Sequence, residues 1–427
     1  MDRRQFMKNS GLLLMAVPWT ASLQYQQHVS KQKVKIGVIG VGSRGRFLTL
    51  YLSALSNVEI IAICDDYKVN LEKVHKEIVP DARMYSDYKD LLDQRDIDAV
   101  VIATPLYLHH RMVLDSFIAG KHVFCEKAMG MNLSECKEMY YAYKASGKCF
   151  FVGQQRLFDP KYLKTMQLIK SGELGDVQRI NCFWYRNHNW RHNVPSPELE
   201  RKINWRMYRE YSCGLMTELG GHQLQVGTWA LQSLPKKIMG TGSVIYWKDG
   251  REVDDSLSVI YQFEKGQQMT YNSVISNKFY GLEEQILCSA GTIEPEKGLY
   301  YSETIKPAAG LLQMINDFEH SIFDHIPIAG TSWVPETAVK MKPEYLLSKE
   351  EKLAGISPNA LKLVGSKHDG TPLLLQSFVN SVITGEQPEN IAEECYYASV
   401  LALLGYQAIQ EKNIIDFPDE AKIPYHY

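Results

Sequence analysis

Short runs of apolar residues alternate with longer amphipathic stretches between about residues 34 and 153 of the chain. The apolar runs are KIGVIG, VEIIAICD, DAVVIATP, HVFCEKAMG and CFFVGQ, and each stretch that follows one has the spacing of a helix. Short, wholly apolar strands separated by helices are typical of a parallel sheet that is covered on both faces. The pattern therefore predicts a doubly wound, Rossmann-type α/β domain.

The pattern changes after Asp159, where longer segments alternate apolar and polar residues. These segments are DVQRINCFWYR, KKIMGTGSVIYW, SLSVIYQFE, QQMTYNSVIS and EEQILCSAG. Such alternation predicts a large, mainly antiparallel sheet. We expect a polar, aromatic loop over 187–209, a helix from Cys213 to Gln232, and two last helices, 373–384 and 393–411, that pack back on the body.

These patterns divide the chain into three parts. Residues 1–32 are expected to be an export signal and linker, residues 33–155 the dinucleotide-binding domain, and residues 156–427 an α+β domain for substrate binding and oligomerisation. A stretch at about 294–369 is rich in Pro, Lys and Glu and has little periodicity, so we expect a long irregular insertion there.

The first apolar run ends in a glycine-rich turn. Gly40, Gly42 and Gly45 form the pattern GxGxxG between a strand and a helix, and Asp65 ends the next strand about 20 residues later. In such a turn the glycines permit a tight bend, close approach of a pyrophosphate and packing of helix on strand. The helix N-terminus then faces the phosphates, which predicts a dinucleotide site.

The acidic residue Asp66 directly follows Asp65. A negative ribose pocket repels a 2′-phosphate, so we expect NAD as the cofactor. Arg44 and Lys68 lie near enough in sequence to supply positive charge, which leaves NADP as the less favoured alternative.

The composition excludes several classes of function. The formal net charge of −2 provides no basic field for nucleic acid or an anionic membrane surface. The 8 cysteines contain no CxxC pair, so neither a metal nor a redox motif is indicated, and we expect free, buried thiols.

The expected partners are a small-molecule substrate and further copies of this chain, held together through the C-terminal sheet.

The N-terminal residues carry an export pattern. Arg3 and Arg4 precede Phe6 and Lys8, and a short apolar stretch follows over 11–17. This order is typical of a twin-arginine signal, and the stretch is far shorter than the roughly 18 residues of a membrane span. We therefore expect a periplasmic protein that is exported in the folded state with its nucleotide already bound.

Four motifs follow one another along the chain: the glycine loop, ATPxxxH at 103–109, EKA at 126–128 and ExxxH at 218–222. In this order the chain resembles the Gfo/Idh/MocA family (glucose-fructose oxidoreductase, inositol dehydrogenase, rhizopine catabolism) over residues 33–415. NWRMYRE at 204–210 is similar to its exported members. The resemblance implies an NAD(P)-dependent oxidoreductase that acts on a sugar or glycoside hydroxyl.

Oxidation of an alcohol needs a base for the hydroxyl proton and a positive group near the developing oxyanion. The resemblance implies that Lys127 is the catalytic lysine. His222 is the candidate base because imidazole titrates near neutral pH, and Glu218, one helical turn earlier, is expected to orient it. Such a Glu/His pair can also hold a metal, but no further ligands cluster with it, so we predict none.

The residues expected to bind the cofactor lie in the glycine loop and at the carboxyl ends of strands, where such sheets bind ligands. They are Gly40, Gly42, Ser43, Arg44, Gly45, Asp65, Thr104, Pro105, His109, Glu126 and Lys127.

Aromatic side chains together with Arg, His and amide groups suit a carbohydrate, which has an apolar face and many hydroxyls. The substrate candidates are Gln155, Arg156, Tyr185, His188, Trp190, Arg191, Trp205, Arg206, Tyr208 and Gln225. Two positions depart from the family pattern. Ala128 replaces the usual proline, and Gln225 stands where an aspartate often occurs, so the substrate geometry stays open.

Two further functions remain as alternatives. An exported enzyme has no NADH pool, so a captive nicotinamide that is reduced and reoxidised within one turnover would permit a glycosidase, an epimerase or a sugar–sugar oxidoreductase. The THGLGP-type segment of NAD-dependent N-acetylgalactosaminidases does not occur where ExxxH stands. A nucleotide-bound scaffold without activity is disfavoured by the intact lysine and histidine.

Overall fold

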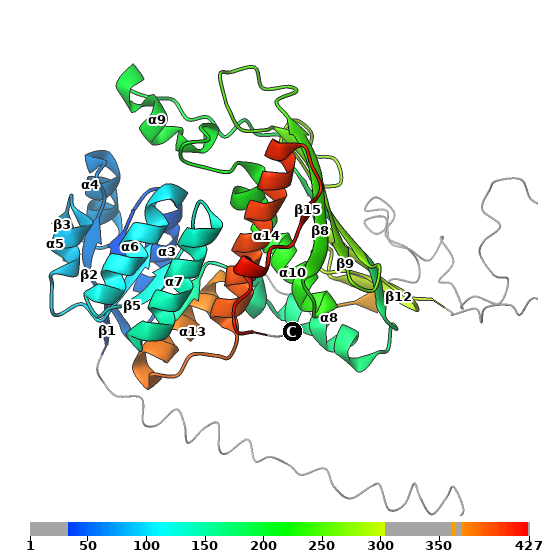
Figure 1. Ribbon diagram of the computed structural model, residues 1–427. Helices are drawn as coiled ribbons and strands as arrows, with labels where there is room; N and C mark the ends of the chain where they lie inside the picture. The colour runs from blue at the N-terminus through cyan, green and yellow to red at the C-terminus, as the bar shows by residue number, and fades with distance from the viewer. Residues whose placement is uncertain (1–32, 304–360, 364–368, 426–427) are drawn as a thin grey trace, which may run out of the picture.

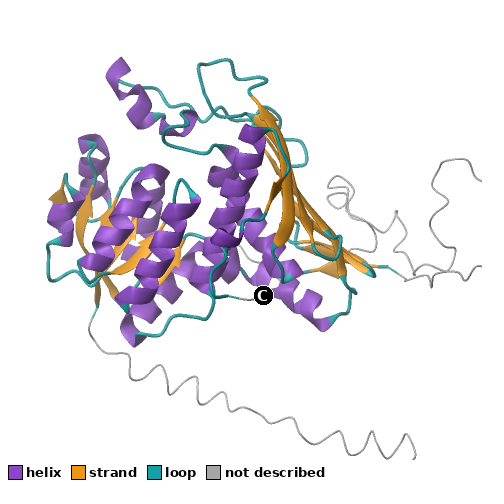
Figure 2. Ribbon diagram, in the orientation of Figure 1, coloured by secondary structure: helices purple, strands orange, loops and turns teal. Residues whose placement is uncertain are grey.

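The computed structural model describes residues 33–303, 361–363 and 369–425. The expected export signal and most of the expected irregular insertion lie outside the described residues. Two sheets lie side by side along the molecule (Figure 1). Helices cover both faces of the first sheet and one face of the second (Figure 2).

The first sheet is parallel and has the strand order β3-β2-β1-β4-β5-β6. Its strands are β1 (Val34–Ile39), β2 (Val58–Cys64), β3 (Arg83–Tyr85), β4 (Ala99–Ile102), β5 (His122–Cys125) and β6 (Phe150–Val152). The helices between them are α3 (Ser43–Ser53), α4 (Lys68–Glu77), α5 (Tyr88–Leu92), α6 (Leu106–Ile118) and α7 (Leu133–Ser146). The predicted doubly wound domain is confirmed.

The second sheet has nine strands among the described residues, in the order β14-β13-β12-β11-β7-β10-β9-β8-β15. They are β7 (Val177–Tyr185), β8 (Pro235–Ser243), β9 (Ser256–Phe263), β10 (Gln268–Val274), β11 (Leu282–Cys288), β12 (Gly291–Glu294), β13 (Leu299–Ser302), β14 (Leu361–Lys362) and β15 (Ile415–Asp416). Only β7 and β10 pair in parallel, so the mainly antiparallel prediction is confirmed. Strands β13 and β14 fall within the segment expected to be irregular.

The remaining helical elements lie mostly around the second sheet. They are η2 (Gln155–Phe158), α8 (Pro160–Ser171), η3 (Pro197–Leu199), α9 (Glu200–Ile203), η4 (Trp205–Met207), the π-helix η5 (Met216–Gly220), α10 (Gly221–Leu231), α13 (Thr371–Thr384), α14 (Ile391–Glu411) and η7 (Asp419–Ala421).

Helix α14 joins the two halves of the molecule. It packs against α7 and β6 on one side and against α10 and β8 on the other (Figure 1). Tyr396 and Tyr397 at its centre are fully buried. Helix α13 packs on α3 and β1, so this part of the C-terminal segment returns to the dinucleotide-binding domain rather than staying with the second sheet.

The three glycines of the first turn have different structural requirements. Gly40 has a φ of +83°, a conformation that side chains rarely adopt. A Cβ at Gly45 would lie 1.8 Å from the Gly40 carbonyl oxygen, which is backbone and has no room to move. At Gly42 the nearest atom to a Cβ would be the Asn70 amide nitrogen at 3.6 Å, an ordinary contact. Packing within the protein therefore excludes a side chain at Gly45. At Gly42 the protein itself leaves room for a Cβ, so the need for glycine there comes from the expected ligand.

We predict that Gly45→Ala destabilises the cofactor-free protein by about 1–3 kcal/mol, the usual cost of overpacking, as measured by chemical denaturation. Gly42→Ala is the matched control and should unfold like the parent protein while binding NAD more weakly, because its methyl group occupies the path of the pyrophosphate. Equal stability of the two variants would contradict this account of the turn.

Candidate active site

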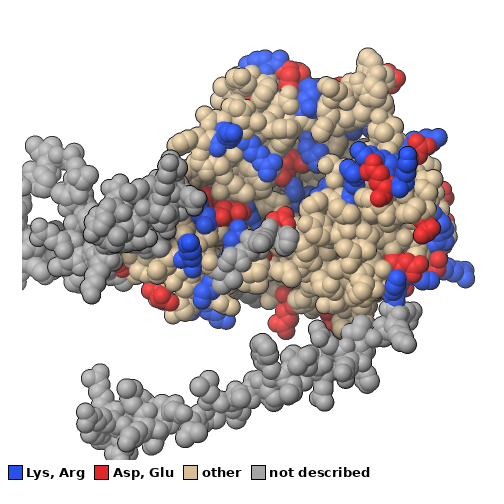
Figure 3. Space-filling view, turned by 180° about the vertical axis from the view of Figure 1, so that it is seen from behind, with Lys and Arg blue, Asp and Glu red and all other residues tan. Residues whose placement is uncertain are grey.

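A cavity of about 860 Å³ lies between the two sheets. Its walls come from the start of α3, the ends of β4 and β5, the end of β7 with the loop after it, and the junction of η5 with α10. Seen from behind, basic and acidic side chains gather in the hollow between the two lobes (Figure 3). The first turn after the glycine loop and the EKA and ExxxH motifs thus meet at one cavity.

On the cofactor side, Asp65 holds the glycine loop in place. Its carboxylate accepts hydrogen bonds from the backbone N–H of Val41 at 2.9 Å and of Tyr67 at 2.8 Å. Burial raises the pKa of Asp65, and these two bonds oppose the rise. No side chain caps the N-terminus of α3, so its first amides are free for a phosphate.

Ser43 and Arg44 on the first turn of α3 line the cavity. The Arg44 Nε donates to Glu126 Oε1 at 2.7 Å, which links the glycine loop to the end of β5. Thr104 and Glu126 also line the cavity, as expected.

His109 is a structural link between two strand ends. Its Nδ1 lies 2.8 Å from the Ala128 carbonyl oxygen and its Nε2 lies 3.0 Å from that of Thr104. The side chain is buried, and this burial lowers its pKa. The neutral ring can donate to only one of these two carbonyl oxygens, and His109 also lines the cavity, where it was expected as a cofactor residue. Pro105 contributes by starting α6.

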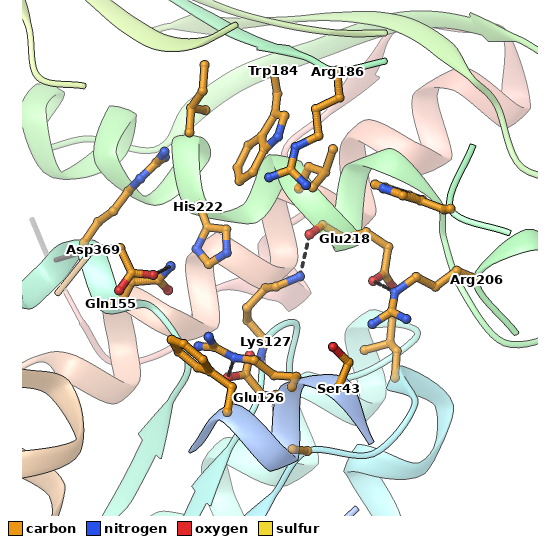
Figure 4. Close-up of a pocket in the computed structure, with 18 of the residues that line it drawn as sticks. Ser43, Glu126, Lys127, Gln155, Trp184, Arg186, Arg206, Glu218, His222 and Asp369 are labelled. Carbon is orange, nitrogen blue, oxygen red and sulfur yellow. Dashed lines mark hydrogen bonds and ion pairs between the residues drawn. The ribbon is translucent and has the colours of Figure 1, made fainter. Parts of the chain in front are cut away.

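Lys127 crosses from the end of β5 to the second domain. Its Nζ donates to the backbone carbonyl oxygens of Glu218 at 2.5 Å and Thr217 at 3.3 Å (Figure 4). Burial lowers the pKa of Lys127, against the pull of two nearby carboxylates. The ammonium form therefore loses its proton more readily than that of an exposed lysine. The peptide bond between Lys127 and Ala128 is cis.

His222 lies beside Lys127 on the first turn of α10 (Figure 4). Its Nδ1 is 2.9 Å from the Gln154 side-chain oxygen, while the Gln154 amide nitrogen lies 3.5 Å from the carbonyl oxygen of Gly221. The amide therefore presents its oxygen to the ring, so Nδ1 carries the proton and Nε2 has the free lone pair. Burial, reinforced by Lys127, lowers the pKa of His222 well below its ordinary value, which keeps the ring neutral.

The expected orientation of His222 by Glu218 is wrong. The Glu218 carboxylate accepts from Arg206 Nε at 2.8 Å and from Ser212 Oγ at 3.1 Å. Residues 216–220 form a π-helix, and its wider turn removes the spacing by which positions four apart face each other in an α-helix. Burial raises the pKa of Glu218, but Arg206 and Lys127 outweigh it, so the net shift is downward. Gln154 performs the orienting role instead.

Six of the ten substrate candidates line the cavity, Gln155 among them, and four do not. The other lining residues are Arg156, His188, Trp190, Trp205 and Arg206; those outside are Tyr185, Arg191, Tyr208 and Gln225.

Each of the four has a physical reason to lie elsewhere. Tyr185 is on the opposite face of β7 from Trp184, because successive strand residues alternate. Arg191 pairs with Glu200 and Asp249, and Tyr208 donates to Glu200 at 2.9 Å. Gln225 is fully buried, with its amide nitrogen 3.5 Å from a Glu394 carboxylate oxygen of α14.

The sequence analysis missed Gln154, Trp184, Arg186 and His192. Trp184, Arg186 and His192 line the cavity, and Gln154 lies behind His222. The alternation along β7 contained the signal for Trp184, since Ile180 and Cys182 share its buried face. Nothing in the sequence paired Gln154 with a residue 68 positions away.

The chain matches two sequence families over most of its described length. Residues 34–154 match the oxidoreductase family with an NAD-binding Rossmann fold, and residues 162–294 match the GFO/IDH/MocA C-terminal domain. The chain belongs to the Gfo/Idh/MocA oxidoreductase family. The first domain of this family member is accordingly an NAD-binding Rossmann domain.

Individual relatives match the chain at low sequence identity and over only part of its length. An uncharacterized oxidoreductase of Streptococcus pneumoniae is 29% identical over 251 residues, which is 59% of this chain and 62% of that protein. Inositol 2-dehydrogenase of Salmonella typhimurium is 29% identical over 150 residues, 35% of this chain and 45% of that enzyme. The match thus spans less than two thirds of either relative.

Among solved structures, myo-inositol 2-dehydrogenase of Lactobacillus plantarum superposes with a TM-score of 0.66 at 18% identity. The superposition covers 91% of this chain and 100% of that chain, so the fold is shared along nearly the whole length.

The described residues contain neither a candidate metal cluster nor a candidate membrane span. No group of three or more His, Cys, Asp or Glu side chains in the described ranges is arranged to hold a metal ion. Within the same ranges, no helix is both long and apolar enough to cross a membrane.

We predict that Asp65→Ala weakens NAD binding by about 1–3 kcal/mol, because a buried charged acceptor is lost and the glycine loop is loosened. Asp66→Ala is the control, since Asp66 is exposed and pairs with Lys202 at 2.9 Å. Calorimetry of both variants with NAD checks the difference. Unchanged affinity in Asp65→Ala would mean that the ribose site lies elsewhere.

Proposed function

We propose that the protein is an NAD-dependent dehydrogenase that oxidises a hydroxyl of a sugar or a related cyclic polyol. The observation that carries this proposal is the convergence of the Lys127 amine and the His222 ring on one cavity that opens onto the glycine loop. A base and a cation at one point are what removal of a hydroxyl proton requires.

In this proposal His222 acts through Nε2. It accepts the proton of the substrate hydroxyl, while the bond from Nδ1–H to Gln154 fixes the tautomer and the ring orientation. The Lys127 ammonium lies where it stabilises the oxyanion as the carbonyl forms. NAD, which the glycine loop and the Asp65 strand end would hold, would supply the acceptor for the hydride that leaves the same carbon.

The shape and chemistry of the cavity support a carbohydrate. Trp184, Trp190 and Trp205 offer flat surfaces for the apolar face of a sugar, and His188 and His192 offer groups for its hydroxyls. The inositol dehydrogenases to which the chain is similar are named for a cyclic polyol, and this agrees with the proposal.

The export motif at Arg3 and Arg4 favours a second candidate in the same cavity. A periplasmic enzyme with a captive cofactor would return the hydride to its product, or to a second sugar, so that no NADH leaves. The two candidates use the same base and the same cation and differ only in where the hydride ends.

We predict that His222→Gln and Lys127→Met each lower the rate of bound-NAD reduction by about 10²–10⁴, the usual value of a positioned acid or base. Absorbance of the reduced nicotinamide, read with hexoses, hexuronates and inositols, measures the rate. NAD binding by His222→Gln should be unchanged, and Lys137→Met, on α7 and outside the cavity, is the control. Turnover of His222→Gln near that of the parent protein would remove His222 from the mechanism.

The depressed pKa of His222 predicts a characteristic pH profile. The neutral ring is the active form, so activity is lost only as the pH falls through the lowered value. We expect kcat/KM to stay level through the ordinary imidazole range near about 6.5 and to fall only below it. An acid limb centred at or above that range would contradict the assignment of His222 as the base.

We predict that the double variant Arg3→Lys, Arg4→Lys stays in the cytoplasm, folded and loaded with NAD, since the paired arginines are the export signal. Fractionation of cells with an immunoblot, followed by native mass spectrometry, checks location and cofactor together. Export as efficient as that of the parent protein would refute a twin-arginine route and weaken the case for a captive cofactor.

A further inference from the structure

Arg186 directly follows β7 and forms part of the cavity wall. Its backbone N–H donates to the Val274 carbonyl oxygen at 2.8 Å, which fixes its position against β10. The side chain extends from the sheet beside Trp184 toward Lys127 and His222 (Figure 4). Its guanidinium carbon lies 5.1 Å from the centre of the Trp184 ring.

Arg186 differs from the other arginines of the cavity in its pairing. Each of the others forms an ion pair: Arg44 with Glu126, Arg156 with Glu284 and Glu296, and Arg206 with Glu218. Among the described residues, no carboxylate lies within ion-pair distance of Arg186. Burial lowers its pKa, and no described carboxylate opposes that effect.

A hydrogen-bond donor without an acceptor lies next to it. The Trp184 indole Nε1–H is buried and has no partner among the described residues. A buried donor of this kind costs free energy until an acceptor reaches it. Arg186 therefore presents, on the wall of the cavity, a cation without a carboxylate partner among the described residues, and it packs on a tryptophan whose own N–H is buried and unpaired there.

We propose that the substrate carries a carboxylate, and that this group binds to the Arg186 guanidinium. This inference rests on the proposed function and names the class of sugar as an acidic one. One guanidinium can bind both oxygens of a carboxylate. A phosphate dianion would leave one charge uncompensated there, and a neutral hydroxyl would leave the cation unpaired.

The arrangement also sets the orientation of the sugar. A carboxylate on Arg186 fixes one end of the substrate on the sheet side of the cavity, and the reacting hydroxyl then faces Lys127 and His222. The oxidised carbon is therefore a ring carbon and not the one that bears the acid. In this orientation the tryptophans of the cavity contact the apolar face of the sugar ring.

Matched pairs of sugars that differ only in this group test the inference. Glucuronate with glucose, galacturonate with galactose, and mannuronate with mannose are titrated by calorimetry into the full-length protein loaded with NAD. Glucose 6-phosphate serves as the phosphate probe. The variants are Arg186→Gln and, as a control that removes the same charge from an exposed position on the strand that Arg186 follows, Arg179→Gln.

We expect at least one hexuronate to bind about 10–100-fold more tightly than its neutral partner, the range of a charge-assisted hydrogen bond. Arg186→Gln should abolish that preference, and Arg179→Gln should keep it. The inference is overturned if no acid binds better than its neutral partner, if the preference survives Arg186→Gln, or if glucose 6-phosphate binds best through Arg186. Preferred binding of an acid without reduction of NAD would refute the proposed dehydrogenase and leave the carboxylate site standing.

Discussion

The buried amine of Lys127 and the backbone carbonyls of the π-helix form the contact on which the site depends. This contact joins the carboxyl end of β5 in the NAD-binding domain to the segment that carries Glu218 and His222. Where the hydrogen-bond register of a helix changes, carbonyl groups lose their helical partners and need another donor. The lysine supplies that donor, so the Lys127 amine is held by the element that leads directly into the helix of His222.

Other side-chain contacts join the same end of β5 to the glycine loop and to β4. The Arg44–Glu126 ion pair connects the glycine loop to the end of β5, directly before Lys127. His109 lies between the backbone after Lys127 and the end of β4. Helix α14 packs against both domains, so their relative position is fixed by a buried helix rather than by surface contacts. Lys127 and His222 thus lie at one cavity between two domains that a buried helix holds together.

The sequence was informative wherever function depends on local pattern. The glycine loop, the strand ends and the lysine of EKA were placed correctly because each is a turn at the end of a buried strand. Strand β3 was missed because its three residues are partly exposed and form no apolar run. Glu218 was given the wrong contact because the spacing of four assumes α-geometry, whereas the chain forms a π-helix there. Gln154 and Arg186 depend on contacts between distant segments, which no local pattern encodes.

The central claim is that the cavity holds an unprotonated imidazole nitrogen beside the lysine. Nitrogen NMR of the protein with labelled histidine, assigned by comparison with His222→Gln, measures this directly. The account predicts a neutral His222 at pH 7, with the proton on Nδ1 and none on Nε2. A charged ring, or a neutral ring with its proton on Nε2, would contradict it.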